Sequence, residues 1–265
     1  MKQKYDIVVA DTAGNITIFV LTKAPRREYA EIAQKLLALK EYKGEQVCFV
    51  IDDDSAEMCG LEFCGNASRS FGLLKAKKLG IKGEGTVSIN MSGAKGPLEV
   101  FVNTESNFTR IRMPLPLNIQ SLDLAAIVSG DNALLMDFEG ITHVIVFDVP
   151  AGKDKFEEIK KYIQKHDDPP AIGVMFYDRK TREMTPVVYV KDVDTTYFEG
   201  SCGSGTTAAA IALALEEDHS VGSFTYVISQ PEGSISSNVV IKDGQLQSVT
   251  IEGSVKLSTP IAVEI

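Results

Sequence analysis

Hydrophobic and polar positions in the first fifty residues follow two patterns. Residues 5–13 and 16–21 are mostly apolar runs rich in valine, isoleucine and threonine, separated by a Gly-Asn pair at 14–15. This arrangement predicts two strands joined by a tight turn. Residues 26–41 place apolar side chains at helical spacing on one face, and residues 44–52 alternate again. We therefore expect an amphipathic helix followed by a third strand.

The second half of the chain repeats this order. Residues 140–150 predict a strand, residues 153–166 an amphipathic helix, and residues 171–178 and 184–192 two further strands. Because the same succession of elements occurs twice, and each half closes in glycine-interrupted hairpins, the pattern indicates a gene-duplicated protein.

Aspartate and glycine mark the connections. Residues 52–62 begin with three aspartates and predict a loop, whereas residues 86–103 predict a hairpin with a glycine-rich turn. The pair Asp243-Gly244 predicts a tight turn within a final meander of strands.

Each half also contains a Cys-Gly pair that opens a helix. The frames are EFCGNASRS around Cys64 and EGSCGSGTT around Cys202. The helix after Cys202 is apolar on all sides from residue 208 to 215, so it must be covered on every side, and a barrel-like sheet around a central helix provides such cover. We expect the helix after Cys64 to be less enclosed, because Arg69 and the lysines near its end need to reach solvent.

These patterns together predict an α/β (α+β) fold with two pseudo-symmetric domains. Each domain is expected to be a barrel-like, mostly antiparallel sheet around a central helix. We place the first domain at residues 1–117 with Cys64, and the second at residues 118–256 with Cys202. A last strand at about 257–265 can complete the first domain.

Composition narrows the classes of partner. The 265 residues are 44% hydrophobic and carry a net charge of −9, which argues against nucleic acid as a partner. No apolar run approaches the roughly 18 residues of a membrane span, and the first residues turn acidic too early for a signal peptide. We expect a cytoplasmic protein with no membrane association, whose four cysteines are thiols rather than disulfides.

The cysteine spacing argues against a structural metal. Cys59 and Cys64 lie five residues apart, but the chain has no second close pair, and none of its three histidines stands at a ligand-like distance from a cysteine. Cys48 falls within an apolar strand and is interpreted as a small buried hydrophobe. We therefore predict no metal.

Two thiols at helix N-termini suggest chemistry at a carbon atom. The first N–H groups of a helix favour a thiolate, and they also form a ready site for a carboxylate. A thiolate on one face of an α-carbon and a thiol on the other could remove and return a proton, which inverts the centre without a cofactor. The glycines after each cysteine allow close approach, and Asn66, Ser204 and Thr206 add donors. The resting protein should then hold one thiolate and one thiol.

At these residues the chain resembles the diaminopimelate epimerase-like, cofactor-independent amino acid racemases. Cys64-Gly65-Asn66 with Arg69 is similar to the first-cysteine motif of that family, and the run Cys202 to Gly205 is similar to the second. The resemblance implies that Cys64 and Cys202 are catalytic and that the partner is a small amino acid substrate. A homodimer is left open.

The resemblance also implies a set of substrate-binding residues. Asn15 resembles a substrate-binding Asn of the family, Glu45-Gln46 resembles an Asp-Gln pair, and His143 closes a segment similar to Gly-Asn-Pro-His. For Gln46 and His143 a purely structural hydrogen bond is an equal alternative. With Glu199 and the groups that follow the cysteines, the candidate substrate-binding residues are Asn15, Glu45, Gln46, Gly65, Asn66, His143, Glu199, Gly203 and Ser204.

One departure from the family bears on the substrate. The Arg that precedes the second cysteine in diaminopimelate epimerases has no counterpart in DVDTTYFEGSC, where Asp194 and Glu199 are acidic. The pattern is closer to the histidine racemase branch, and an acidic site suits a basic or aromatic side chain, which Glu45 and Glu199 would contact. The alternatives are diaminopimelate, another basic amino acid, or, in a different class, a non-catalytic protein that clamps an amino acid carboxylate.

Overall fold

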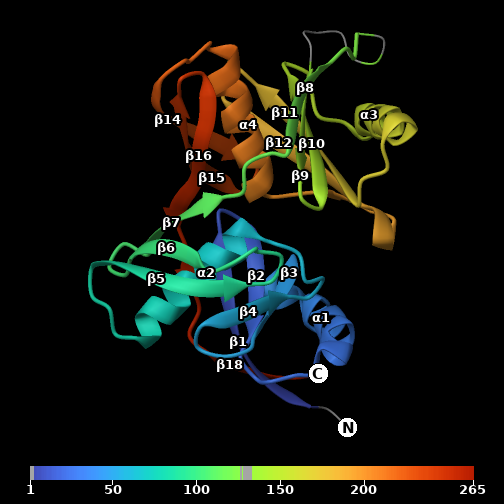
Figure 1. Ribbon diagram of the computed structural model, residues 1–265. Coiled ribbons are helices and arrows are strands. Elements are labelled where there is room, and N and C mark those ends of the chain that lie inside the picture. The colour runs from blue at the N-terminus through green and yellow to red at the C-terminus, as the bar shows by residue number, and fades with distance from the viewer. Residues whose placement is uncertain (1–2, 126, 128–132) are drawn as a thin grey trace. The chain divides into compact units, whose positions relative to one another are not determined.

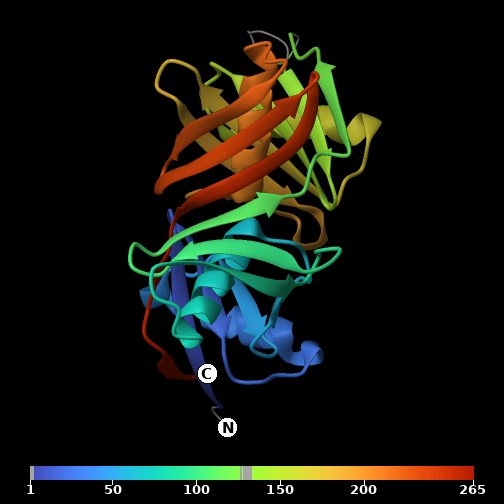
Figure 2. The same ribbon diagram turned by 60° about the vertical axis from the view of Figure 1, so that its left-hand side comes forward.

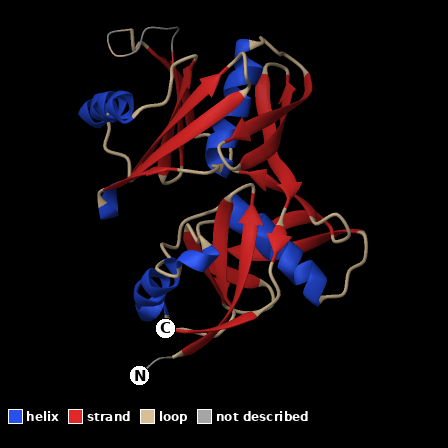
Figure 3. Cartoon of the chain, turned by 180° about the vertical axis from the view of Figure 1, so that it is seen from behind, coloured by secondary structure: helices blue, strands red, loops and turns tan. Residues whose placement is uncertain are grey.

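β-Strands dominate both halves of the chain in the computed structural model, which describes residues 3–125, 127 and 133–265 (Figure 3). The described residues form two units, each with two α-helices. The first unit comprises Met1–Arg112 and Glu252–Ile265, and the second comprises Met113–Ile251. The boundaries 1–117 and 118–256 for folding domains stay a prediction. No helix of the described residues has the length and apolar character needed to cross a membrane.

The first unit opens with a hairpin. Strand β1 (Lys4–Thr12) pairs antiparallel with β2 (Asn15–Val20) through a turn at Ala13 and Gly14, whose φ angles are 55° and 85°. Two successive positive φ angles match the twist of the strands that they join. The turn therefore lies one residue earlier than the sequence predicts, and Asn15 is the first residue of β2.

The helix expected over residues 26–41 is shorter in the structure. Helix α1 (Tyr29–Leu37) is flanked by the 3-10 turns η1 (Arg26–Glu28) and η2 (Lys40–Tyr42), because Leu39 is extended and interrupts the helix. The apolar face of α1 contacts β3 (Gln46–Val50), which runs parallel to β2, and its buried residues are Tyr29, Ile32, Ala33 and Leu36.

The segment expected to be a loop contains a short strand. Strand β4 (Ser55–Met58) pairs antiparallel with β3 and parallel with β5 (Glu84–Met91). Its buried residues Ala56 and Met58 alternate with more exposed ones, but four residues beside three aspartates are too few for the alternation to stand out.

The hairpin predicted at 86–103 is present, and the end of the chain closes the other side. Strand β5 pairs with β6 (Leu98–Asn103), which pairs with β7 (Phe108–Met113), all antiparallel. On the far side, β17 (Lys256–Leu257) and β18 (Ile261–Glu264) pair antiparallel with β1. The first unit is thus built from both ends of the sequence (Figure 1).

Helix α2 (Gly65–Lys78) packs against β1, β5 and β6. Gly72 allows this approach, because a Cβ at this position would lie 2.7 Å from Val100. The expectation that Arg69 reaches solvent is wrong: its exposure is 0%. Hydrogen bonds from its guanidinium to groups inside the unit take the place of water, whereas Lys77 and Lys78 at the helix end are exposed.

The second unit repeats the order hairpin, helix, parallel strand, return strand, Cys-Gly helix and hairpin. Its α-helices are α3 (Lys153–His166) and α4 (Gly203–Glu216). Its strands are β8 (Asn118–Leu122), β9 (Ala133–Phe138), β10 (Ile141–Phe147), β11 (Ala171–Asp178), β12 (Glu183–Val190), β13 (Thr195–Phe198), β14 (Gly222–Gln230), β15 (Gly233–Lys242) and β16 (Gln245–Ser254).

Pairing in this unit follows that of the first. Strands β9 and β10 form a hairpin, β11 runs parallel to β10 after α3, and β12 returns antiparallel to β11. Strands β14 and β15 form the hairpin after α4, beside β16 (Figure 2). The sequence pattern gave no prediction for β8, β9 and β13. A 3-10 turn, η3 (Lys191–Val193), connects β12 to β13.

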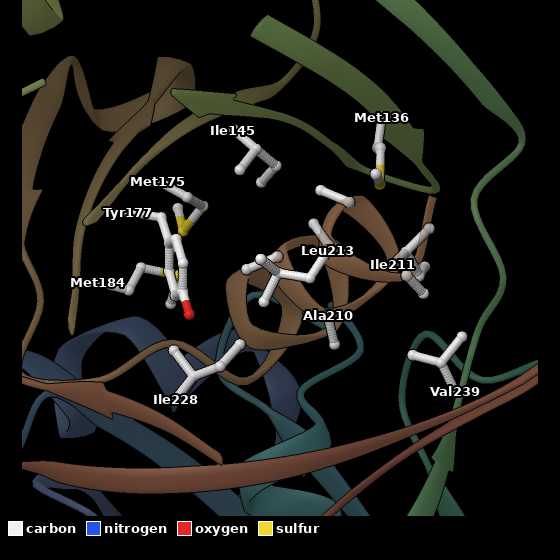
Figure 4. Packing of buried hydrophobic residues seen from close by; sticks show 14 of the residues in the cluster. Met136, Ile145, Met175, Tyr177, Met184, Ala210, Ile211, Leu213, Ile228 and Val239 are labelled. Atoms are coloured by element: carbon white, nitrogen blue, oxygen red, sulfur yellow. The ribbon is translucent and has the colours of Figure 1, made fainter. Parts of the chain in front are cut away.

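Helix α4 is covered on all sides, as its sequence predicts. Residues 208–214 are all buried, and α4 contacts β10, β11, β14 and β15. Leu215, the last residue of the predicted apolar run, is exposed, because it lies in the final turn of the helix. Figure 4 shows side chains that surround the helix, among them Met175 from β11 and Ile228 from β14. This core fixes the start of α4, and with it the position of Cys202.

Candidate active site

Cys64 is the residue that caps the N-terminus of α2. Its backbone is extended, with φ −129° and ψ 112°, and its Sγ accepts a hydrogen bond from the N–H of Ala67 at 3.4 Å. The carbonyl of Cys64 accepts the first helical hydrogen bond from Ser68, whose hydroxyl donates to the same carbonyl at 2.7 Å. The thiol is therefore held in the position where the helix presents its unpaired N–H groups.

Cys202 has the same position at the start of α4. Its φ is −131° and its ψ 116°, and its Sγ accepts from the N–H of Gly205 at 3.4 Å. Thr206 donates both its N–H and its hydroxyl to the Cys202 carbonyl. Each unit thus builds, independently, the same cysteine cap with a hydroxyl residue four positions later.

The first two N–H groups of each helix precede any partner within the helix. These belong to Gly65 and Asn66 in α2, and to Gly203 and Ser204 in α4. N–H groups in this position bind anions. Each helix start therefore combines a thiol with a place for part of a carboxylate.

An amide cluster surrounds Cys64. The Nε2 atom of Gln46 lies 3.4 Å from the sulfur and also donates to Asn15 Oδ1 at 2.9 Å and to Thr17 at 2.8 Å. The Nδ2 atom of Asn15 donates to Glu45 Oε2 at 2.8 Å. Three residues that the sequence identified as candidates thus lie together with the first cysteine.

Asn66 extends this cluster away from the sulfur. Its Nδ2 atom donates to Asn15 Oδ1 at 3.3 Å, and its Oδ1 accepts from Arg69 Nε at 3.2 Å. Its side chain is thus already paired inside the first unit, and its backbone N–H forms a hydrogen bond with Cys64 that favours the thiolate.

The hydroxyl of Ser204 connects the Cys202 thiol to the imidazole of His143. Ser204 Oγ lies 3.5 Å from Cys202 Sγ and 2.9 Å from His143 Nε2. His143 is fully buried, and burial lowers its pKa to about 4, so the ring is neutral at pH 7. Gly173 makes room for the ring, because a Cβ there would lie 2.3 Å from His143 Nδ1.

Gln230 and Glu199 complete the surroundings of the second cysteine. Gln230 accepts from the N–H of Cys202 at 2.8 Å and donates to Thr206 at 2.9 Å, which ties the cap to β14. Glu199 hydrogen-bonds the Cys202 thiol, and its charge opposes ionisation of that thiol.

Burial raises the pKa of both thiols above the ordinary value. For Cys64, N–H donors and Gln46 partly oppose this effect, whereas Glu62 adds to it. For Cys202 the pKa is raised well above its usual range by burial first and by Glu199 second. The sequence argument that helix ends favour a thiolate omitted burial, which here is the larger effect at both thiols.

The candidate residues fall into two clusters, one in each unit. The first comprises Asn15, Glu45, Gln46, Cys64, Gly65 and Asn66, and the second comprises His143, Glu199, Cys202, Gly203 and Ser204. Their roles toward a substrate stay predictions.

Sequence reasoning missed four residues of these surroundings: Thr17, Glu62, Gly173 and Gln230. Only Gly173 carried a signal, as a glycine inside an apolar strand, which is typical of a close approach. Asp194, the acidic residue that the sequence places where the family has a cation, accepts a hydrogen bond from Tyr189 at 3.0 Å.

Comparison with known proteins identifies the family of this chain. Residues 6–260 match the family model described as the histidine racemase CntK N-terminal domain. A histidine racemase of Fusobacterium nucleatum (strain ATCC 23726) is 34% identical over 222 residues, which cover 80% of this chain and 82% of the relative. A histidine racemase of Staphylococcus aureus (strain Mu50) is 24% identical, with 84% of each chain covered.

Solved structures show the same fold at low identity. A "predicted epimerase" from Pseudomonas aeruginosa matches with a TM-score of 0.70 at 13% identity, and covers 98% of this chain and 99% of its own. A hydroxyproline epimerase from Agrobacterium vitis, with trans-4-hydroxy-L-proline bound, matches with a TM-score of 0.65 at 12% identity, covering 99% and 92%.

The α+β fold is that of the diaminopimelate epimerase-like and proline racemase-like proteins, and the protein is an enzyme, an isomerase of the racemase class. Because the family model spans nearly all of the sequence and the capped cysteine recurs at the start of α2 and α4, the chain belongs to the histidine racemase family.

Proposed function

We propose that the protein racemises histidine by a two-base mechanism in which Cys64 and Cys202 are the two bases. The observation that carries this proposal is the repeated cysteine cap: nearly the same backbone angles and the same N–H to sulfur hydrogen bond occur at the start of α2 and of α4. The mechanism requires the two sulfurs to approach one α-carbon from opposite faces.

The proposed steps conserve the proton count. One thiolate takes the α-proton, so that the Cα–H bond breaks and an S–H bond forms. The other thiol then gives its proton to the opposite face and becomes the thiolate for the reverse direction. The N–H groups at the start of each helix, those of Gly65 and Asn66 and those of Gly203 and Ser204, bind the substrate carboxylate and stabilise the charge that develops on it.

Burial opposes ionisation of both thiols, and the groups around each sulfur make the two differ. The pKa is raised at Cys64 but raised well above its usual range at Cys202, where Glu199 also opposes the charge. We infer that Cys64 is the thiolate and Cys202 the thiol when the first proton is removed. Activity should then rise with pH on the acid side of its profile as Cys64 ionises.

Carboxylates near both thiols favour a basic or aromatic substrate side chain. Glu45 lies in the Cys64 cluster and Glu199 beside Cys202. Either can accept a hydrogen bond from an imidazole, whereas the distal carboxylate of diaminopimelate would be repelled. The names of the relatives point to histidine among the basic and aromatic amino acids.

Solvent exchange tests the proposal directly. In deuterium oxide, L-histidine should lose its α-proton signal while its circular dichroism decays. Cys64→Ser and Cys202→Ser should each lower turnover by at least about a thousandfold, because a hydroxyl is a far weaker acid–base group here. Cys59→Ser, five residues before Cys64 and half-buried, is the matched control and should keep full activity.

Two outcomes would contradict parts of this proposal. Full turnover in either Cys64→Ser or Cys202→Ser removes the two-base mechanism. Faster exchange with L-lysine, L-ornithine or diaminopimelate than with L-histidine keeps the mechanism but reassigns the substrate.

A further inference from the structure

Arg69 is a buried positive charge without a carboxylate partner. Its side chain is 0% exposed, and no Asp or Glu among the described residues lies within ion-pair distance of it. Nη1 donates to the Gly253 carbonyl at 2.9 Å and to Thr109 Oγ1 at 3.3 Å, while Nη2 has no hydrogen-bond partner. A buried charge without a counter-ion costs free energy. The groups that contact Arg69 therefore indicate what the charge is used for.

The hydrogen bonds from Arg69 run in one direction. A guanidinium can only donate, so Arg69 Nε obliges Asn66 to present Oδ1 to it, at 3.2 Å. Asn66 must then turn Nδ2 outward, where it donates to Asn15 Oδ1 at 3.3 Å. Asn15 in turn donates to Glu45, an acceptor when ionised, at 2.8 Å. A cation at one end and an acid at the other thus set the orientation of both amides.

This orientation reaches the sulfur of Cys64 through Gln46. Because Asn15 presents Oδ1 inward, it accepts from Gln46 Nε2 at 2.9 Å. The same Nε2 atom lies 3.4 Å from Cys64 Sγ and Gln46 Oε1 lies 3.6 Å from it, so the donor is the nearer of the two amide atoms. A donor at this distance favours the thiolate over the thiol.

The positive charge of Arg69 also favours ionisation of the Cys64 thiol. Burial lowers the pKa of Arg69 to about 10, which leaves it charged at neutral pH, and a thiolate at Cys64 acts against this lowering. The attraction is reciprocal, so a charged Arg69 favours the Cys64 thiolate. The acids that face this group are Glu62, which opposes ionisation of Cys64, and Glu252, which faces Arg69 and pairs with Arg110.

We propose that Arg69 is a positioning residue of the Cys64 cluster: it sets the direction of the amide chain and supplies the buried positive charge that favours the thiolate. The claim concerns thiol chemistry within the first unit. It rests on the proposed function only in giving that thiolate a catalytic use, and its test needs no substrate.

Alkylation by iodoacetamide measures the thiolate fraction of each cysteine. The rate is followed from pH 6 to pH 10 or so, and the modified cysteine is located by peptide fragmentation. In Arg69→Met the pH midpoint of Cys64 should rise by about one unit, a roughly tenfold slower reaction at pH 7. Cys202 in the same molecule is the internal control, and its alkylation rate at each pH should stay unchanged.

Two further variants separate charge from packing. Thr109→Val removes one partner of Arg69 but leaves its charge and its bond to Asn66, so Cys64 should keep its midpoint. Arg69→Lys keeps the charge but cannot hold Asn66 and Gly253 together in the same fork, so a smaller rise is expected.

The results that overturn the proposal are distinct from loss of racemase activity. In a folded Arg69→Met variant, an unmoved midpoint at Cys64, or an equal slowing of alkylation at Cys64 and Cys202, would refute it. If circular dichroism shows that Arg69→Met does not fold, Arg69→Lys decides, and an unchanged Cys64 midpoint in that variant overturns the proposal.

Discussion

At the scale of single residues, burial and hydrogen bonding compete for each ionisable group near the cysteines. Burial disfavours the charged form of the two thiols and of His143. Hydrogen bonds from helix N–H groups to both sulfurs, and from Gln46 to Cys64, partly offset the rise in the thiol pKa. The balance differs between the two units, since Arg69 in the first stays charged and His143 in the second stays neutral at pH 7.

His143 should make stability depend on pH. Its pKa is lowered from 6.5 to about 4, so below pH 6.5 the unfolded chain takes up a proton that the native ring refuses. Stability is therefore fully present above pH 6.5 and is lost as pH falls toward 4, by up to about 3 kcal/mol in total.

Urea unfolding at pH 7 and pH 4.5 checks this expectation. The free energy of unfolding should differ less between pH 7 and pH 4.5 in His143→Gln than in the wild type, whatever general loss of stability the substitution causes. His166→Gln, at the exposed end of α3, is the matched control and should behave as wild type. An equal pH dependence in wild type and His143→Gln would contradict a buried neutral imidazole.

At the scale of elements, glycines let the helices and strands come close enough to position the cysteines. Gly72 brings α2 onto β6, and Gly205 brings the first turn of α4 onto β11, where a Cβ would lie 2.2 Å from Met175 Sδ. In each pair the helix and the strand are both packed against further elements, so neither can move away to make room for a larger side chain.

Gly205→Ala should therefore destabilise the second unit. The added methyl group must displace Met175 or the cap of Cys202, whose Sγ would lie 3.2 Å from it. A loss of about 1–3 kcal/mol in the free energy of unfolding is expected from overpacking of this kind. Gly96→Ala is the control, since a Cβ there meets nothing within 4 Å. Wild-type stability in Gly205→Ala would show that Met175 yields without cost.

At the scale of the whole molecule, the chain returns to the unit in which it began. Strand β18 pairs with β1 in register Tyr5 with Val263 and Ile7 with Ile261, so the last residues cover a side of the first sheet that would otherwise be an open edge. Val263 also belongs to the core that includes Tyr5 and Ile7.

Deletion of residues 256–265 should destabilise the first unit selectively. Hydrogen exchange should show lost protection in β1 and β2, while β10 and β11 of the second unit keep theirs. Glu264→Ala, an exposed position on the same strand, should leave exchange unchanged. Equal loss of protection in both units would mean that they do not unfold separately.

Much of this organisation could be predicted from local patterns. Period and length identified α3 within its observed bounds, and the absence of any polar stripe predicted the cover around α4. Short elements were not predicted: β4 has only four residues, and its alternation of buried and exposed side chains is not recognisable beside three aspartates. The Cys-Gly pairs located both helix caps, since the capping residue is local in sequence.

What the sequence by itself determined was the repeat of elements and the two cysteine caps, because both depend on residues within a few positions of each other. Tertiary structure alone decided the neighbours of the sulfurs and their effect on ionisation. Arg69 stands in the first-cysteine motif, yet its burial depends on Gly253, which lies 184 residues away, and the pKa of each thiol depends on groups that only folding brings close. The electrostatic interaction of two groups depends on their distance in space and on the exclusion of water, and the separation of residues along the sequence gives neither.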